Sequence, residues 1–321
     1  MTQNTVSKMY SVKQKFLIIM LRAVGDVLLT TPLIRALKKN NPANEIYFLT
    51  GKSAEKILRY NPYLSGIIPW DKDTLGKIRE QKFDTVIDFM HSAISGYYTL
   101  FSGAKKRLAF YRPWGFWCYN IMPKYQDKGY TVNDRLQILE ELGVSGDGID
   151  LDLVFAAENE KKVLDFFYKN KISRQNFLVT LDITNRRKHR QWQKEKFSRL
   201  ADLLAEKYNA RIIFLWGPGE LDYVKSAMSL CKKQHILCDN FDILDLAALI
   251  KNCSLHIGTS SAPAHIAVSQ KTPTFIIYGQ KNGAYGWSPP ESIHGYIQGE
   301  LKNLSVETVL EKLSNYLEKK N

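Results

Sequence analysis

The stretch that most constrains the fold of this chain is residues 16–32, FLIIMLRAVGDVLLTTP. Its first six residues are all apolar, which is typical of a strand buried on both faces. A glycine-containing turn, RAVGD, follows, and residues 27–38 then carry apolar side chains at helical spacing. Pro32 suits the first turn of a helix, so we expect the helix to begin there. Strand, turn and helix in this order predict an open α/β sheet that binds a ligand at its carboxyl edge.

Asp26 closes this turn, and two roles are open for its carboxylate. A carboxylate just before an apolar helix commonly caps the free amide groups of the first turn. A carboxylate at the carboxyl edge of a sheet can also act as a base in a ligand site. These residues alone favour the cap.

The alternation of strands and helices continues through the first half of the chain and restarts after a Gly/Asp-rich stretch, GVSGDGID. This pattern predicts α/β architecture with doubly wound parallel sheets. We expect a first Rossmann-like domain at 1–155 and a second at 156–302. Residues 303–321 should form a helix that packs back across the domains.

The chain is basic: 45 Lys and Arg against 32 Asp and Glu give its 321 residues a net charge of +13. Such a charge favours an anionic partner, although no nucleic-acid motif accompanies it. Neither GxGxxG nor GxxxxGK[ST] occurs, which argues against nicotinamide redox chemistry and P-loop hydrolysis. The four cysteines lack CxxC spacing, so neither a metal site nor a disulfide framework is expected. A polar start and the lack of a long apolar stretch predict a cytoplasmic chain without an export signal.

Residues 103–124 mix bases with aromatic side chains. One interpretation is a lip that grips an anionic, partly apolar acceptor or touches a membrane surface. The other is a buried strand and loop with basic edges. The sequence favours neither.

Three segments of the second half suit a nucleotide. The loop at 182–192, DITNRRKHRQW, places a cluster of bases between a strand and a helix, where charge and free amides bind a diphosphate. Glu220, after WGPG, can accept hydrogen bonds from a ribose or cap the next helix. The turn at 258–265, GTSSAPAH, offers amides, hydroxyls and the imidazole of His265 to a phosphate.

Taken together, LRAVGDVLLTTPLIRALKK, FSGAKKRLAF, KHRQW, WGPGE and GTSSAPAHIAVSQKTPTFIIYG occur in an order that resembles the heptosyltransferases of bacterial lipopolysaccharide synthesis, glycosyltransferase family 9. The resemblance covers nearly all of residues 15–300. It implies the GT-B architecture, two Rossmann-like domains facing across a cleft. It also implies inverting transfer of a heptose from ADP-heptose to the lipid-linked inner core, with no metal or other cofactor. Contact with the cytoplasmic face of the inner membrane follows from such an acceptor.

The resemblance also implies site residues. Asp26 matches the family's catalytic base, Arg190 a donor-binding lysine, and Glu220 a ribose-binding carboxylate. The expected donor-binding set is Lys188, Arg190, Glu220, Phe241, Ser260, Ser261, Ala262 and His265, with Phe241 near the adenine. The expected acceptor-binding set is Arg22, His91 and Arg112.

The phosphate-binding turn departs from the family pattern of Asp, then Ser or Thr, then Gly. Ser260 replaces the Asp and so removes a negative charge, and Ala262 restricts the backbone approach that glycine permits. These departures leave two alternatives open: a transferase with another nucleotide-sugar donor, and a non-catalytic protein of the same fold that binds a nucleotide or phosphoglycan.

Overall fold

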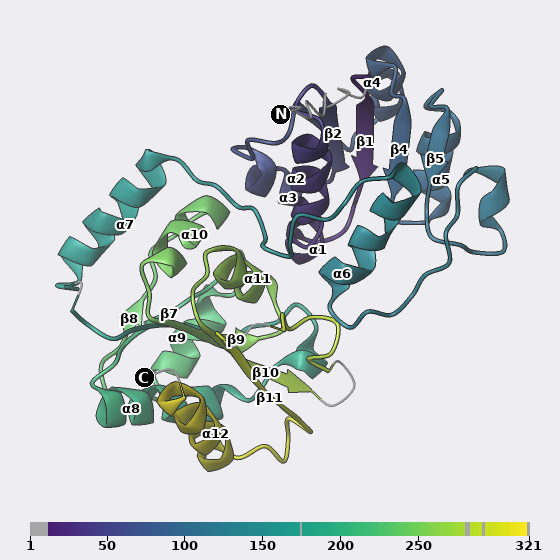
Figure 1. Ribbon diagram of the computed structural model, residues 1–321. Helices are drawn as coiled ribbons and strands as arrows, with labels where there is room; N and C mark the ends of the chain where they lie inside the picture. Colours follow the sequence, from purple (N-terminus) through teal and green to yellow (C-terminus); the bar gives the residue numbers. More distant parts are fainter. Residues whose placement is uncertain (1–11, 174, 280–282, 291–292, 320–321) are drawn as a thin grey trace, which may run out of the picture. The chain divides into compact units, whose positions relative to one another are not determined.

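The computed structural model describes residues 12–173, 175–279, 283–290 and 293–319 (Figure 1). The chain forms two compact units. The first comprises Met1–Asp127 and Val132–Ile149, and the second comprises Lys128–Thr131 and Asp150–Asn321. Each unit is built on its own parallel sheet, as the alternation of strands and helices predicts.

The first unit contains a five-stranded parallel sheet in the order β3-β2-β1-β4-β5. The apolar run that opens the sequence supplies its central strand, and Leu17, Ile18 and Ile19 are fully buried between neighbours on both sides. The strands are β1 (Lys15–Ile19), β2 (Glu45–Thr50), β3 (Gly66–Pro69), β4 (Thr85–Asp88) and β5 (Lys106–Leu108). The helices are α1 (Val24–Leu28), α2 (Thr31–Asn40), α3 (Lys52–Leu58), α4 (Thr74–Gln81), α5 (Ala93–Leu100), η1 (Gly115–Trp117), α6 (Thr131–Leu136) and η2 (Gln137–Leu142).

The helix predicted after β1 is interrupted. A short helix, α1, ends at Leu28, and α2 begins at Thr31 with Pro32 in its first turn, as expected for a residue that lacks an amide hydrogen. The hydroxyl of Thr30 donates to the carbonyl of Asp26 at 2.9 Å and so joins the two helices.

The second unit contains a six-stranded parallel sheet in the order β11-β10-β9-β6-β7-β8. Its strands are β6 (Leu178–Asp182), β7 (Arg211–Phe214), β8 (Ile236–Leu237), β9 (Leu255–Thr259), β10 (Thr274–Gly279) and β11 (His294–Gly299). Its helices are α7 (Ala157–Lys169), η3 (Lys188–Arg190), α8 (Lys194–Tyr208), α9 (Leu221–Met228), α10 (Ile243–Lys251), α11 (Ala262–Ser269) and α12 (Val306–Glu318). The contacts of α12 with α8 and β11 lie within this unit.

Both sheets reverse their strand order at one place, between β1 and β4 in the first unit and between β6 and β9 in the second. Doubly wound sheets bind ligands outside the carboxyl ends of the strands at such a reversal, because the two following loops diverge there. The fold therefore places a candidate site after β1 and β4, and another after β6 and β9.

Candidate functional site

Asp26 lies in the first turn of α1, beyond the carboxyl end of β1. The helix begins at Val24, earlier than the apolar spacing indicates, so its N-cap is Ala23 and the capping role favoured for Asp26 is wrong. Asp26 Oδ1 instead accepts a hydrogen bond from Arg135 Nη2 at 2.8 Å, and the two side chains are only 14% and 10% exposed. Oδ2 has no hydrogen bond from any described residue and is not buried, so it is the oxygen able to take a proton.

Arg135 fixes both the side chain and the backbone at this position. Its Nη1 donates to the carbonyl oxygen of Asp26 and, at 2.7 Å, to the hydroxyl of Thr30. The guanidinium carbon lies 5.9 Å from the ring centroid of Phe89, which follows β4. One buried cation thus ties α6 to the segments that follow β1 and β4, and it holds the carboxylate in one orientation.

Asp88, the last residue of β4, is 1% exposed. Its Oδ2 accepts the hydroxyl of Tyr119 at 2.6 Å, and its Oδ1 accepts the amide of Met90 at 2.7 Å. Burial raises the pKa of the Asp88 carboxyl and the pKa of the Tyr119 hydroxyl. This pair holds the turn that leads from β4 to α5.

His91 occupies that turn with φ of +50°, a left-handed conformation that few residues with a side chain adopt. Its ring packs between Trp114 and Tyr119, with centroids 4.9 Å away in each case, and its buried Nε2 has no hydrogen-bond partner among the described residues. Burial, and then the charge of Arg112, lower the pKa of His91 to about 4. At neutral pH this side chain therefore offers an acceptor no positive charge. The other two residues expected on the acceptor side, Arg22 and Arg112, are exposed.

In the second unit, the corresponding position after β6 also holds a buried carboxylate. Asp182 is 3% exposed; its Oδ2 accepts the hydroxyl of Ser261, and its Oδ1 accepts the amide of Thr184 at 3.3 Å. Burial raises the pKa of Asp182 to about 6, and the charge of Glu220 adds to that rise. Because β6 and β9 are neighbours, this carboxylate meets the start of the turn after β9.

Glu220 occupies the N-cap position of α9, but its side chain makes no capping hydrogen bond. Its Oε2 accepts the amide of Gly217 and the hydroxyl of Thr184, both at 2.8 Å. Oε1 has no hydrogen bond from any described residue and is not buried. Thr184 therefore connects the expected ribose-binding carboxylate to Asp182 and, through Asp182, to Ser261.

The basic loop after β6 forms the short helix η3 and is anchored by Trp192, which is fully buried and donates from Nε1 to the carbonyl of Leu304 at 3.1 Å. Lys188 is exposed and Arg190 is half-buried. Burial and the neighbouring Arg187 lower the pKa of the Arg190 guanidinium. A partly desolvated guanidinium beside a second cation is well suited to an anion that supplies two charges.

The remaining expected donor residues lie in the loop after β8, in the turn after β9 and in α11, the helix that follows this turn. Ser260 accepts a hydrogen bond from the amide side chain of Asn185 on its carbonyl oxygen at 2.9 Å, and Ala262 is the first residue of α11. His265, buried within α11, has its ring centroid 5.9 Å from that of Trp287. Phe241, ahead of α10, packs edge-on against Phe166 at 5.5 Å.

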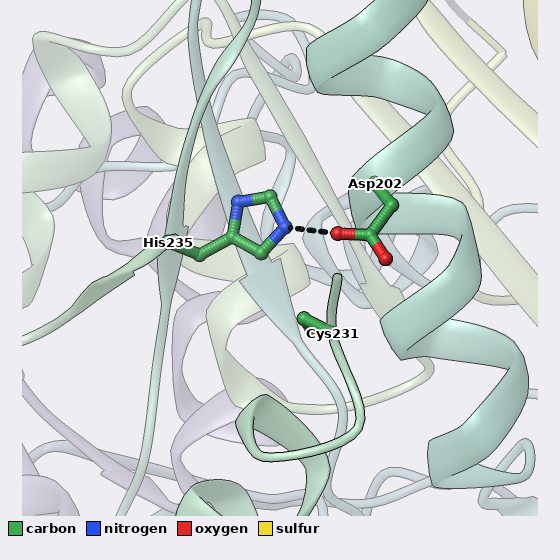
Figure 2. A group of neighbouring side chains, drawn as sticks. All are labelled: Asp202, Cys231 and His235. Carbon is green, nitrogen blue, oxygen red and sulfur yellow. Dashed lines mark hydrogen bonds and ion pairs between the residues drawn. The ribbon is translucent and has the colours of Figure 1, made fainter. Parts of the chain in front are cut away.

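Among the residues that the structure describes, one group has three side chains of metal-binding type close together: Asp202, Cys231 and His235, with ligand atoms within 4.8 Å of one another. Figure 2 shows Asp202 and His235 pointing toward each other, with His235 Nε2 3.0 Å from Asp202 Oδ1. The same carboxylate accepts the amides of Lys232 and Lys233, and burial raises the pKa of the Cys231 thiol to about 11. These hydrogen bonds anchor the loop before β8 on α8, and the expectation of no metal site stays a prediction.

The sequence also matches known proteins. The sequence model of a protein family, glycosyltransferase family 9 (heptosyltransferase), matches residues 74–313, which are most of the chain. This chain belongs to glycosyltransferase family 9. Membership confirms the expected enzyme class, a glycosyltransferase, and the resemblance from which it was inferred.

Individual relatives agree with this family. Lipopolysaccharide heptosyltransferase 3 of Escherichia coli K12 is 26% identical over 319 residues, which cover 92% of each chain. A family 9 glycosyltransferase from Veillonella parvula superposes with a TM-score of 0.86 at 19% identity, over 95% of this chain and 97% of that one. The E. coli heptosyltransferase WaaC with ADP superposes with a TM-score of 0.76 at 16% identity, over 95% and 98% of the two chains. These structures confirm the fold class, two Rossmann-like units of the GT-B type.

None of the helices formed by the described residues is long and apolar enough to cross a membrane.

Sequence reasoning missed four residues that build these sites: Arg135, Asp88, Asp182 and Thr184. Asp88 and Asp182 carried a usable signal, because each is an acidic residue at the end of a buried apolar strand. Arg135 carried no such signal in the sequence, because its partner Asp26 lies 109 residues away along the chain.

Proposed function

We propose that this glycosyltransferase moves a heptose from ADP-heptose to the inner core of lipopolysaccharide, with inversion and without a metal. The observation that carries the proposal is the carboxylate of Asp26, which Arg135 orients through one oxygen while the other has no hydrogen bond from any residue that the structure describes. The family supports the reaction class. The name of the E. coli relative supports the sugar and the acceptor, and the ADP in the WaaC structure supports the nucleotide.

The acceptor side of the reaction belongs to the first domain. As the acceptor oxygen attacks the anomeric carbon, its proton passes to Asp26 Oδ2. The new carbon–oxygen bond forms while the bond to the diphosphate breaks, and ADP leaves with the bonding electrons. General-base assistance of this kind contributes about 10²–10⁴ in rate. Arg135 acts as a positioning residue, while the exposed Arg22 and Arg112 are suited to anionic groups of the acceptor.

The donor side belongs to the second domain. Arg190 and Lys188 neutralise the charge that grows on the leaving diphosphate, together with the amides at the start of α11. Glu220 Oε1 accepts the ribose hydroxyls, and Phe241 lies near the adenine. Ser260, Ser261, Ala262 and His265 form the phosphate-binding turn. The Ser261 hydroxyl donates to Asp182, so Ser261 binds the phosphate through its backbone amide. Its hydroxyl becomes available to the phosphate only if Asp182 moves away.

The turn after β9 also supports a second candidate, transfer from another nucleotide sugar. Ser260 lacks the acidic side chain that the family usually carries there, and Ala262 adds a methyl group where the family usually has glycine. Both changes act on the site that discriminates between donors. A non-catalytic protein that holds a nucleotide or phosphoglycan is the remaining alternative.

We place the protein in the cytoplasm, with peripheral contact at the cytoplasmic face of the inner membrane, because the proposed acceptor is lipid-linked. This location is consistent with the net charge of +13.

Calorimetric titration with ADP, UDP and GDP, followed by transfer assays with the matching sugars, tests the proposal. Preference for ADP together with transfer of heptose to a lipopolysaccharide core acceptor supports it. Preference for UDP or GDP would support a glycosyltransferase that uses another nucleotide sugar as its donor. ADP binding without transfer to any core acceptor supports the non-catalytic alternative.

A further inference from the structure

The helix α5, AISGYYTL, packs on β4 (Figure 1). Its small polar residues are buried and its large apolar residues are exposed, the reverse of the usual arrangement. Its buried positions hold Ser95, Gly96 and Thr99, whereas Ile94, Tyr97 and Leu100 are exposed. The exposed residues recur three residues apart and form one face. A surface helix normally buries its large apolar residues against the core. An exposed apolar face of this kind therefore indicates a surface that contacts a protein partner or a membrane.

The helix η1 extends this face. A Cβ atom on Gly96 would lie 3.0 Å from the sulfur of Cys118, so the end of η1 lies directly against α5. Phe116 and Trp117 in η1 are 59% and 72% exposed, and their ring centroids are 4.8 Å apart. Arg107 Nε donates to the carbonyl of Cys118 at 2.9 Å and fixes η1 next to β5. We name Ile94, Tyr97, Leu100, Phe101, Phe116 and Trp117 the aromatic face.

Positive charge surrounds the aromatic face. Residues 92–124 contain five Lys or Arg and no Asp or Glu. Lys105 and Lys106 are exposed, and neither has an ion-pair partner among the described residues. A pocket of about 590 Å³ beside Leu100 and Phe101 is lined by Arg79, Lys82 and Lys105, with Asp84 as its one acidic residue. Asp84 accepts the backbone amide of Lys15 at 2.8 Å.

We propose that the aromatic face docks on a lipid bilayer that carries anionic headgroups. Tryptophan and tyrosine favour the boundary between headgroups and acyl chains, and lysines beside them gain from anionic lipid. A protein partner of ordinary composition would meet these cations with scattered charges of both signs, whereas an anionic bilayer complements a surface on which the cations of residues 92–124 face no carboxylate within that segment and Asp84 is the one acidic residue of the adjoining pocket. The inference rests on the proposed function, whose acceptor is lipid-linked, and it names the surface that reaches that acceptor.

Cosedimentation of the full chain with phosphatidylcholine vesicles, with and without phosphatidylglycerol, tests this surface in the absence of any substrate. Wild type should bind the anionic vesicles more tightly than the neutral ones. The double variant Phe116→Ser/Trp117→Ser should lower partitioning by about 10- to 100-fold, because two aromatic side chains no longer enter the interface. Tyr168→Ser is the matched control, since Tyr168 on α7 is 90% exposed but lies in the other unit; it should bind as wild type does.

Charge is tested separately with Lys105→Glu/Lys106→Glu, which should remove most of the preference for phosphatidylglycerol. Absence of vesicle binding by wild type, or equal losses in Tyr168→Ser and the aromatic double variant, would overturn the proposal. So would a dimer in sedimentation velocity that the aromatic double variant dissociates while vesicle binding is unchanged. Transfer to a delipidated acceptor reports on the proposed function alone, so failure of that reaction with vesicle binding intact would refute the function and not the surface.

Discussion

Arg135 Nη2 lies 2.8 Å from Asp26 Oδ1, and Nη1 of the same guanidinium binds the carbonyl oxygen of Asp26. Side chain and backbone of one residue are therefore fixed by one cation from α6. A similar arrangement occurs elsewhere in the unit, on a more exposed carboxylate that Lys39 also contacts. Arg35 Nε lies 3.0 Å from Asp147 Oδ2, and Arg35 Nη2 donates to the Asp147 carbonyl at 3.2 Å. The second pair provides a matched control for the first.

Arg135→Lys should lower kcat by about 10- to 100-fold, because an ammonium cannot hold both oxygens and a misplaced base loses its alignment. KM for the nucleotide sugar should stay unchanged. Arg135→Lys and Arg35→Lys should lower the melting temperature to a similar extent. Arg35→Lys should nevertheless leave kcat near the wild-type value. Steady-state kinetics and thermal unfolding of both variants check this. Equal kcat losses in the two would show that Arg135 contributes only to stability.

Asp182 should make stability depend on pH. Its pKa is about 6 in the folded chain against 3.8 in the unfolded chain, so the folded state binds more protons between these values. Stability therefore falls as pH rises from about 4 to about 6, by about 3 kcal/mol in total. Asp182→Asn cannot ionise and should remove this contribution. Urea unfolding of wild type and variant at pH 4, 5, 6 and 7 measures it as a difference that grows with pH. A constant difference across these pH values would contradict the assignment.

Arg190→Ala should weaken ADP binding by about 10- to 100-fold, as expected for loss of a charge-assisted hydrogen bond to the diphosphate. Arg199→Ala is the control, because Arg199 lies on α8 in the same unit and its Nε is 3.7 Å from Oε1 of the exposed Glu307, a weak surface ion pair. Its ADP affinity should match wild type in calorimetry. Unchanged affinity in Arg190→Ala would remove this residue from the donor site.

Glu220→Gln tests the ribose contact. The change should weaken binding of ADP by about tenfold, because an amide is a poorer acceptor for two hydroxyls than a carboxylate. Binding of inorganic diphosphate, which has no ribose, should not weaken. Parallel titrations with the two ligands separate the roles, and an equal loss for both would indicate a general disturbance of the loop.

Local sequence patterns predicted the parallel sheets and the positions of their main strands and helices. The buried run before Arg22 gave the central strand, and Pro32 marked the beginning of α2, since both depend on neighbouring residues. The role of Asp26 depends on a partner in another element, and a capping pattern alone gave the wrong structural role. The contact of Asp182 with Ser261 depends on the adjacency of β6 and β9, which only the sheet order supplies.

His91 shows the same limit for electrostatics. The sequence places an imidazole directly after a predicted strand, which made His91 a member of the expected acceptor-binding set. Whether the ring is charged depends on Trp114 and Tyr119, which enclose it, and on Arg112 nearby. Burial is a property of the assembled unit, so composition cannot reveal it.

The most direct test of the central claim is single-turnover transfer from ADP-heptose to a lipopolysaccharide core acceptor in the presence of EDTA, with wild type and Asp26→Asn compared. We predict that wild type releases ADP and extends the acceptor by one heptose without metal. Asp26→Asn should bind ADP with wild-type affinity and transfer about 10²–10⁴-fold more slowly. Wild-type transfer rates in Asp26→Asn would contradict the assignment of the base, and dependence of the wild type on added metal would contradict the proposed mechanism.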